Sequence, residues 1–217
     1  MRTAFLVTDA EDQTSFEDVS FATMTFLSRE RFSSGLGSQK EGDGREGGER
    51  FMLGPVSRVT LPSKYRSDWD ALYVDIMSPT APSTLFRLIN VHLDWLPDMI
   101  HYRAQQINIL AKVLREPGCS GGIIAGDFNA LSHEDDRLVD KNKLVDAWVA
   151  LHGREDPDGD GATWGIGFSR FGPTRLDKVA MTGLKAKEIE ILYPDFIKVP
   201  FEIPWSDHCG LRCTFTI

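Results

Sequence analysis

The sequence predicts an α/β fold in which strands and helices alternate along the chain. The segment from Phe86 to Leu93 alternates apolar and polar residues, as a half-buried strand does. Apolar residues then recur every three or four positions from Ile100 to Leu114, which is typical of an amphipathic helix. The short apolar run from Gly121 to Ala125 indicates a buried strand. A strand, a helix and a second strand in succession favour the α/β class.

Composition limits the kinds of protein this chain can be. Its 217 residues are 41% hydrophobic and 26% charged, which predicts one globular domain over residues 1–217. Neither a run of about 20 apolar residues nor a secretory signal is visible, so we expect no membrane insertion and an intracellular location, cytoplasmic or nuclear. A net charge of -8 argues against a broad groove for nucleic-acid backbones. The three cysteines have no metal-type spacing, which favours free thiols.

The first third of the chain contains a polar insertion between two expected strands. Residues Ser33 to Arg50 are rich in Gly, Ser and charge and predict a mobile loop. The β-prone segment Phe21 to Leu27 precedes the insertion, and Phe51 to Thr60 resembles a returning strand. We therefore expect a long hairpin with this loop at its tip.

The elements after Phe86 can be assigned in order. In that strand the side chains of Asn90 and His92 share the polar face. Asp98 is the expected cap of the following helix, and Pro117-Gly118 its end. Later segments predict one more helix and three more strands, over Leu144 to Leu151, Leu176 to Met181, Lys187 to Leu192 and Leu211 to Ile217.

Four short polar clusters lie at or near the ends of expected strands. They are Asn90-Val91-His92, Gly126-Asp127-Phe128-Asn129, Arg175-Leu176-Asp177 and Ser206-Asp207-His208. Each alone is ordinary turn chemistry or a structural histidine. Together they have the composition of a phosphoester-hydrolysing site, because carboxylates hold a divalent metal and position a water while histidines contact the phosphate.

The clusters also carry a family resemblance. The motifs are Leu88 to Leu93, the helix residues Arg103 and Gln106, Gly126 to Asn129, Arg175 to Val179 and Ser206 to Leu211. In this order they resemble the endonuclease/exonuclease/phosphatase superfamily, closest to its 5′-tyrosyl-DNA phosphodiesterase-like members, over Phe21 to Ile217. The resemblance implies a two-sheet β-sandwich flanked by helices, a four-layer α/β/β/α arrangement.

Roles for the site residues follow from this resemblance. It implies that His92 contacts a phosphate oxygen, that Asp127 positions the attacking water with Asn129, and that Asp177 orients His208. His92, Asn129, Arg103 and Trp164 are the implied substrate-binding residues, although Trp164 could equally pack a loop. Asp207 and Asp127 are the implied metal ligands, with Mg²⁺ as the cofactor and Mn²⁺ as a substitute.

The family's early metal-proximal Asn and Gln-Glu element are not found in this chain. We therefore expect an N-terminally incomplete version of the domain, lacking its first strand or strands. Three functions remain open. They are a Mg²⁺-dependent phosphodiesterase with DNA ends slightly favoured, a non-catalytic family member lacking the metal-ligand Glu, and an inositol or sphingolipid phosphoesterase. The polar character of the Ser33 to Arg50 insertion disfavours the third.

Overall fold

The computed structural model describes residues 5–7, 23–34, 50–66, 69–81, 83–154, 161–166, 172–198 and 202–216. Its centre is a seven-stranded mixed sheet with the strand order β3-β4-β5-β6-β7-β9-β8. The strands are β3 (Phe32–Ser34), β4 (Phe51–Thr60), β5 (Asp70–Met77), β6 (Leu85–His92), β7 (Cys119–Asp127), β8 (Val145–Asp146) and β9 (Asp177–Thr182). The α/β class expected from the sequence is confirmed.

The parallel pair of β6 and β7 positions the chemistry-bearing residues. The pair is joined through the short 3-10 turn η1 (Pro97–Met99) and helix α1 (Ile100–Val113), as a parallel connection requires. Gly126 in β7 has a φ of 134°, and a Cβ there would lie 2.1 Å from the carbonyl oxygen of Val91. Only glycine allows the two strands to approach this closely just before Asp127.

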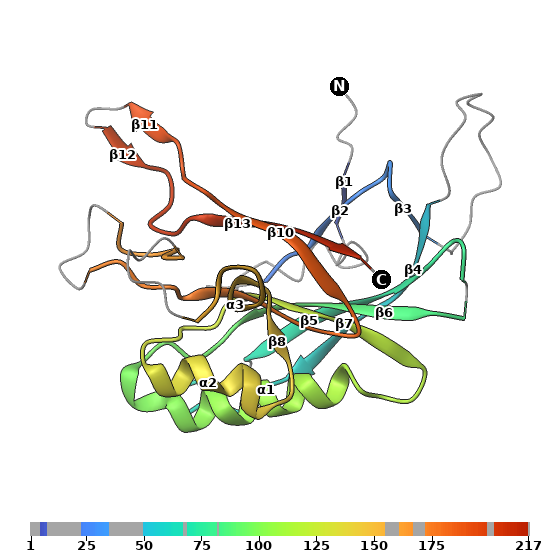
Figure 1. Cartoon of the computed structure of the whole chain (residues 1–217), viewed down its shortest axis with the longest axis horizontal. Helices are drawn as coiled ribbons and strands as arrows, with labels where there is room; N and C mark the ends of the chain where they lie inside the picture. Colours follow the sequence, from blue (N-terminus) through green and yellow to red (C-terminus); the bar gives the residue numbers. More distant parts are fainter. Residues whose placement is uncertain are drawn as a thin grey trace.

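Two helices cover one face of the sheet (Figure 1). They are α1 and α2 (His133–Lys141), and α2 begins with Ser132 accepting a hydrogen bond from the Asp135 backbone N–H. The apolar stripe of α1 packs on this face against alternate residues of the central strands, including Ile89, Val91 and Ile124. The larger hydrophobic core therefore lies between the sheet and the helices.

The opposite face of the sheet is covered by a second, smaller sheet (Figure 1). It consists of the antiparallel pair β10 (Lys185–Leu192) and β13 (Gly210–Thr216), with α3 (Ala147–His152) packed beside it. A second core cluster lies here and includes Val179, Met181 and Ile189. Among the described residues no helix covers the outer side of β10 and β13, so the four-layer arrangement stays a prediction.

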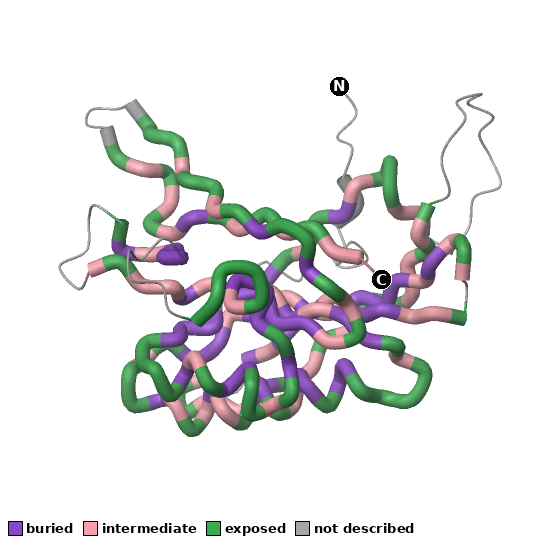
Figure 2. Tube along the Cα trace, in the orientation of Figure 1, coloured by how far each residue is buried: buried purple, intermediate pink, exposed green. Residues whose placement is uncertain are grey.

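A two-stranded antiparallel ribbon leaves the body of the molecule between β10 and β13. Its strands are β11 (Phe196–Lys198) and β12 (Glu202–Pro204). It projects at the upper left of Figure 1, and Figure 2 shows its described residues as mostly exposed. None of the described helices is long and apolar enough to cross a membrane.

Two local predictions are wrong. The expected hairpin around the polar insertion does not form, because β3 pairs in parallel with β4, while β2 (Phe26–Ser28) pairs with β1 (Phe5–Val7). The other edge of β4 is taken by β5, so β3 occupies the remaining edge. Of the predicted loop, Ser33 and Ser34 belong to β3, and residues 35–49 lie outside the described residues.

The second wrong prediction concerns the start of the long helix. Asp98 lies inside η1, and no side chain caps α1, whose N-cap position is Met99. The 3-10 turn takes the place of the cap because its backbone leads directly into the helix. The remaining predicted strands and helices agree with the structure within a few residues.

Candidate active site

Three of the predicted site residues form one row across the central sheet. In the strand register His92 of β6 pairs with Asp127 of β7, and Asp127 pairs with Asp177 of β9. Neighbouring strands lie about 4.8 Å apart, so the three side chains are adjacent although they are far apart in sequence. The sheet thus assembles one imidazole and two carboxylates at the carboxyl end of β6 and β7.

Alternation along the strands decides which way these side chains point. Val179 and Met181 of β9 belong to the core under the β10-β13 pair, and Asp177 is in step with them. Lys178 and Ala180 face the helices instead, since Ala180 packs in the helix-side core. The row therefore faces the space between the two sheets. His208, in the segment just before β13, approaches the row there.

His208 joins the row through Asp177. Its Nδ1 lies 2.7 Å from Oδ2 of Asp177. Asp177 is held in turn by its backbone N–H, which donates to the Thr163 hydroxyl at 2.9 Å. Thr163 is buried, and its carbonyl accepts from the Cys209 backbone N–H at 2.7 Å. Because Nδ1 is engaged by Asp177, Nε2 of His208 is the ring atom left for a substrate.

His92 forms the other end of the row, beside Asp127 in the middle. Nε2 of His92 lies 3.7 Å from Oδ2 of Asp127, and the His92 ring stands edge-on to Trp69. Oδ1 of Asp127 accepts the Asn129 backbone N–H at 2.8 Å, and the Asn129 amide donates to the Leu93 carbonyl at 2.8 Å. Asn129 has a φ of 46°, a left-handed conformation that asparagine tolerates. These bonds fix both side chains beside His92.

The two histidines have opposite pKa shifts. Burial lowers the pKa of His92, which the charge of Asp127 only partly offsets. The hydrogen bond with Asp177 raises the pKa of His208. Burial raises the pKa of Asp127, and the nearby charge of Asp177 adds to that rise. Near neutral pH the row favours a neutral His92 and a His208 with increased affinity for a proton.

The expected metal ligands are not gathered into a cage. Asp207 is exposed, and its Oδ2 accepts a hydrogen bond from the Trp164 indole at 3.1 Å. In the part of the chain that the structure describes, no group of three or more His, Cys, Asp or Glu side chains could hold a metal ion. Mg²⁺ commonly uses one or two carboxylates and completes its shell with water and substrate phosphate. The carboxylates present fit Mg²⁺ bound mainly by water and substrate phosphate, and they do not fit a site in which protein side chains supply all the ligands.

Trp164, expected either to bind substrate or to pack a loop, lies next to His208. Its backbone forms isolated β-bridges with Thr174 and with His208. Its indole is half-buried and bonded to Asp207, so it links the loop before β9 to the Ser206-Asp207-His208 segment. This places Trp164 at the border of the candidate site.

Arg103 is not brought to the substrate-facing side. Its side chain is 1% exposed and forms a bidentate pair with Asp135 at 2.7 and 3.1 Å. It also donates to the carbonyls of Asp94 and Leu96, in the segment that follows His92. The neighbouring Gln106 bonds Asp94 as well. The substrate-binding role expected for Arg103 is therefore replaced by a structural one, because its guanidinium is enclosed behind the segment it supports.

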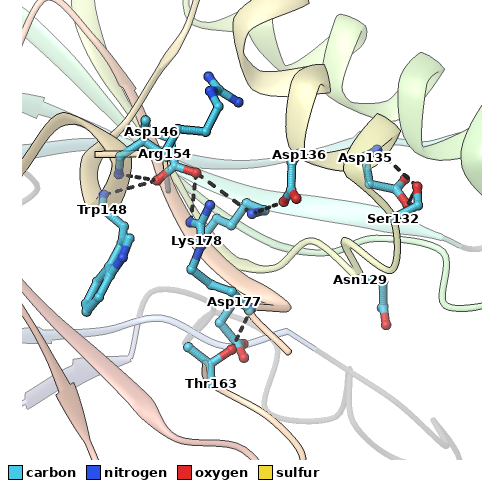
Figure 3. Close-up of polar contacts among 12 residues, drawn as sticks. Asn129, Ser132, Asp135, Asp136, Asp146, Trp148, Arg154, Thr163, Asp177 and Lys178 are labelled. Atoms are coloured by element: carbon cyan, nitrogen blue, oxygen red, sulfur yellow. Dashed lines mark hydrogen bonds and ion pairs between the residues drawn. The ribbon is translucent and has the colours of Figure 1, made fainter. Parts of the chain in front are cut away.

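Sequence reasoning missed a buried charge network behind the row. Nζ of Lys178, on a side chain with no exposure, lies 2.8 Å from Asp136 and 3.8 Å from Asp146. Asp146 also caps α3 and binds Arg175 at 2.8 Å. Figure 3 shows Lys178 between the two carboxylates, while Asp177 points away toward Thr163. The signal was that Asp177 and Lys178 are adjacent in one strand, so their side chains point to opposite faces.

A cavity of about 400 Å³ lies between the two sheets next to this row. Apolar residues of β6, β7 and β9 form much of its lining, and Asp177 belongs to the lining as well. It is further bounded by Met24, Thr25 and Phe26. The candidate site therefore adjoins an apolar space.

Comparisons with known structures show a similar fold. The structure is similar to those of D. rerio TDP2 humanized by 14 mutations (TM-score 0.60, 18% identity, 77% of this chain and 68% of that one) and of D. rerio TDP2 complexed with single-strand DNA product (TM-score 0.59, 16% identity, 77% and 69%). It is also similar to the human Nocturnin catalytic domain with bound sulfate (TM-score 0.52, 21% identity, 76% and 60%). At these identities the likeness shows the fold. No curated protein sequence matches the chain significantly.

The family model of the Endonuclease/Exonuclease/phosphatase family matches residues 19–208, which span His92, Asp127, Asp177 and His208. This match covers most of the chain. The chain belongs to the Endonuclease/Exonuclease/phosphatase family.

Proposed function

We propose that this chain hydrolyses a phosphodiester by water attack, with Mg²⁺ as its cofactor. Family membership supports phosphoesterase or nuclease activity in general. The observation that carries the proposal is the row His92-Asp127-Asp177 with His208 bonded to Asp177 at 2.7 Å. It combines two carboxylates, one neutral imidazole and one imidazole with raised proton affinity in a single site.

The chain's own residues divide the chemical work in this proposal. Asp127, fixed by the Asn129 N–H, aims the attacking water at phosphorus and takes its proton, and the leaving-group oxygen takes a proton from solvent. As the new P–O bond forms and the bond to the leaving group breaks, negative charge grows on the phosphate oxygens. His92 and protonated His208 donate hydrogen bonds to those oxygens and stabilise that charge.

Either of two carboxylates of this chain would hold the metal in this proposal. Asp207 or Asp127 would contribute one carboxylate, and substrate phosphate and water would complete the shell. When bound, Mg²⁺ supplies electrostatic stabilisation of the phosphate oxygens. Hydrolysis is expected to stop in EDTA and to return with Mg²⁺, or with Mn²⁺ at similar concentration.

DNA ends remain the first candidate substrate. A structurally similar protein, D. rerio TDP2, is complexed with single-strand DNA product. A lipid phosphodiester is the second candidate, because the apolar β11-β12 ribbon immediately precedes the Ser206-Asp207-His208 segment. Substrate choice depends on such peripheral segments and not on the row itself.

The test compares three substrates with and without Mg²⁺. They are bis(p-nitrophenyl) phosphate, a 5′-tyrosyl oligonucleotide and phosphatidylcholine vesicles assayed for headgroup release. The proposal expects metal-dependent turnover of the small diester and of one of the other two, and a loss of about 10²-fold or more in His92→Ala. Background rates for all three substrates would favour the non-catalytic alternative.

A further inference from the structure

Two exposed aromatic side chains lie on the segments next to the His92 end of the row. Trp95 follows His92 by three residues and is 59% exposed. Tyr65, in the described part of the loop between β4 and β5, is 62% exposed. A ring that stays this exposed keeps most of its apolar surface for a ligand.

Hydrogen bonds hold the backbones of these two segments together. The Ser63 hydroxyl donates to Oδ1 of Asp94 at 2.8 Å. The Gln106 amide on α1 donates to the Pro62 carbonyl at 2.8 Å and to Oδ2 of Asp94 at 3.0 Å, and both Gln106 and Asp94 are buried. All of these contacts lie within three residues of one of the exposed rings. A ligand that stacks on the rings therefore does not have to order the backbone beneath them.

The same two segments are attached to the row. Trp69, in the residue just before β5, stands edge-on to the His92 ring with the ring centres 5.6 Å apart. The Leu93 backbone N–H donates to the Asp127 carbonyl at 2.8 Å. Three residues span at most about 11 Å, so the backbone of Trp95 lies within that distance of His92. The exposed rings therefore border the position proposed for the phosphate.

Cations alternate with the rings in the loop between β4 and β5. Nζ of Lys64 lies 5.0 Å from the centre of the Tyr65 ring, and the guanidinium carbon of Arg66 lies 5.5 Å from that of Trp69. The hydrogen bond with Tyr65 and, more weakly, the charge of Asp98 raise the pKa of Lys64, so this amine stays protonated at neutral pH. Cations beside exposed rings are typical of sites for single-stranded nucleic acid, where the cations meet phosphates and the rings stack on bases.

The net charge limits how far such a contact can extend. The chain carries a net charge of -8, which disfavours a long track of backbone phosphates. Stacking needs no charge and accepts every base, because every base has a flat face. A base must leave its pair and its neighbours before it can stack on a protein ring. One or two unpaired bases beside the phosphate therefore match both the rings and the charge.

We propose that Tyr65 and Trp95 form a stacking site for an unpaired nucleobase next to the phosphate held at His92. This inference rests on the proposed function for the bond that is cleaved, and it names the group attached to that phosphate. Lys64 supplies a positive charge for a neighbouring backbone phosphate. Binding at the two rings uses residues outside the catalytic row, so it can be measured without hydrolysis.

Fluorescence anisotropy with the full chain in EDTA tests the proposal. The probes are a labelled single-stranded oligonucleotide and the same backbone with abasic sites in place of its bases. The original chain is expected to bind the oligonucleotide with bases about fivefold or more tightly, and Tyr65→Ala with Trp95→Ala should remove this preference. Phe196→Ala, which replaces an exposed ring on the β11-β12 ribbon, is the matched control and should keep it. The slope of log affinity against log salt should be no steeper than about -1.4, the value for two phosphates of a single strand.

Three results would overturn the stacking site. They are no binding of the oligonucleotide, equal affinity for the two probes, and a preference for bases that the double variant retains or that Phe196→Ala loses equally. His208→Ala should keep the preference for bases. A chain that prefers bases but hydrolyses nothing would contradict only the proposed function, whereas hydrolysis of bis(p-nitrophenyl) phosphate without that preference would contradict only the stacking site.

Discussion

Oδ2 of Asp177 lies 2.7 Å from Nδ1 of His208, which joins the first residue of β9 to the segment just before β13. Asp177 belongs to the central sheet and His208 to the segment that leads into the smaller sheet, so this bond connects the two. It fixes the orientation of the imidazole and directs its other nitrogen away from Asp177.

Asp177→Asn is expected to reduce the catalytic rate by about 10²- to 10⁴-fold, because the amide cannot hold the histidine in its protonated form. Steady-state kinetics on a small phosphodiester measures the effect. The matched control is Asp70→Asn, which removes a carboxylate paired with Arg58 on the surface and should leave the rate unchanged. Equal rates in the Asp177 variant and the original chain would mean that His208 acts without this carboxylate.

Stability should depend on pH through the same pair. The hydrogen bond with Asp177 raises the folded pKa of His208 above the ordinary value of 6.5. The stabilisation from protonated His208 is therefore fully present below that value and is lost as pH rises through the folded pKa. Thermal unfolding should show a larger difference between the original chain and Asp177→Asn at pH 6 than at pH 9. A difference that grows with pH would contradict this sign.

Lys178→Met should destabilise the fold by about 3–5 kcal/mol, the range for removing one partner of a buried ion pair. Burial lowers the pKa of Lys178, yet Asp136 and Asp146 both face its amine and would lose that partner. Urea unfolding measures the loss. Lys141→Met, on the exposed side of α2, serves as the control and should change stability by less than about 0.5 kcal/mol.

The Lys178 substitution also tests for a positioning role behind the row. Lys178 directly follows Asp177, so a shift of this backbone should disturb the bond to His208. We expect a lower kcat with little change in KM at a temperature where the variant is folded. An unchanged kcat in the folded variant would mean that Lys178 contributes to stability and does not position the row.

Arg103→Met should cost about 3–5 kcal/mol of stability, because it leaves the buried carboxylate of Asp135 without its bidentate partner. Arg137→Met, an exposed substitution on α2, is the control. Chemical denaturation compares the two variants. A stable Arg103→Met variant with a strongly raised KM would instead mean that Arg103 binds the substrate.

Much of this organisation could be predicted from local sequence patterns. Period-two alternation identified β6, and the apolar stripe identified α1, because both depend on which side chains meet the core. The polar clusters were found because each lies at or near the end of an expected strand. Their assembly into one row depended on the strand register, which pairs Asp127 with both His92 and Asp177.

Other features depended on long-range pairing that no local pattern carries. The parallel pairing of β3 with β4 replaced the expected hairpin. The burial of Arg103 required Asp135, 32 positions away, and the charge network required Lys178 to meet Asp136 across 42 positions. The ribbon formed by β11 and β12 was not predicted from the sequence, because its strands are only three residues long.

The central claim is that the row His92-Asp127-Asp177 with His208 hydrolyses phosphodiesters, and one rate comparison tests it most directly. Hydrolysis of bis(p-nitrophenyl) phosphate in Mg²⁺ is measured for the original chain and for His208→Ala, after both are shown to be folded by circular dichroism. The account predicts turnover by the original chain and a fall of about 10²-fold or more in the variant. Equal rates at background level in both proteins would contradict it.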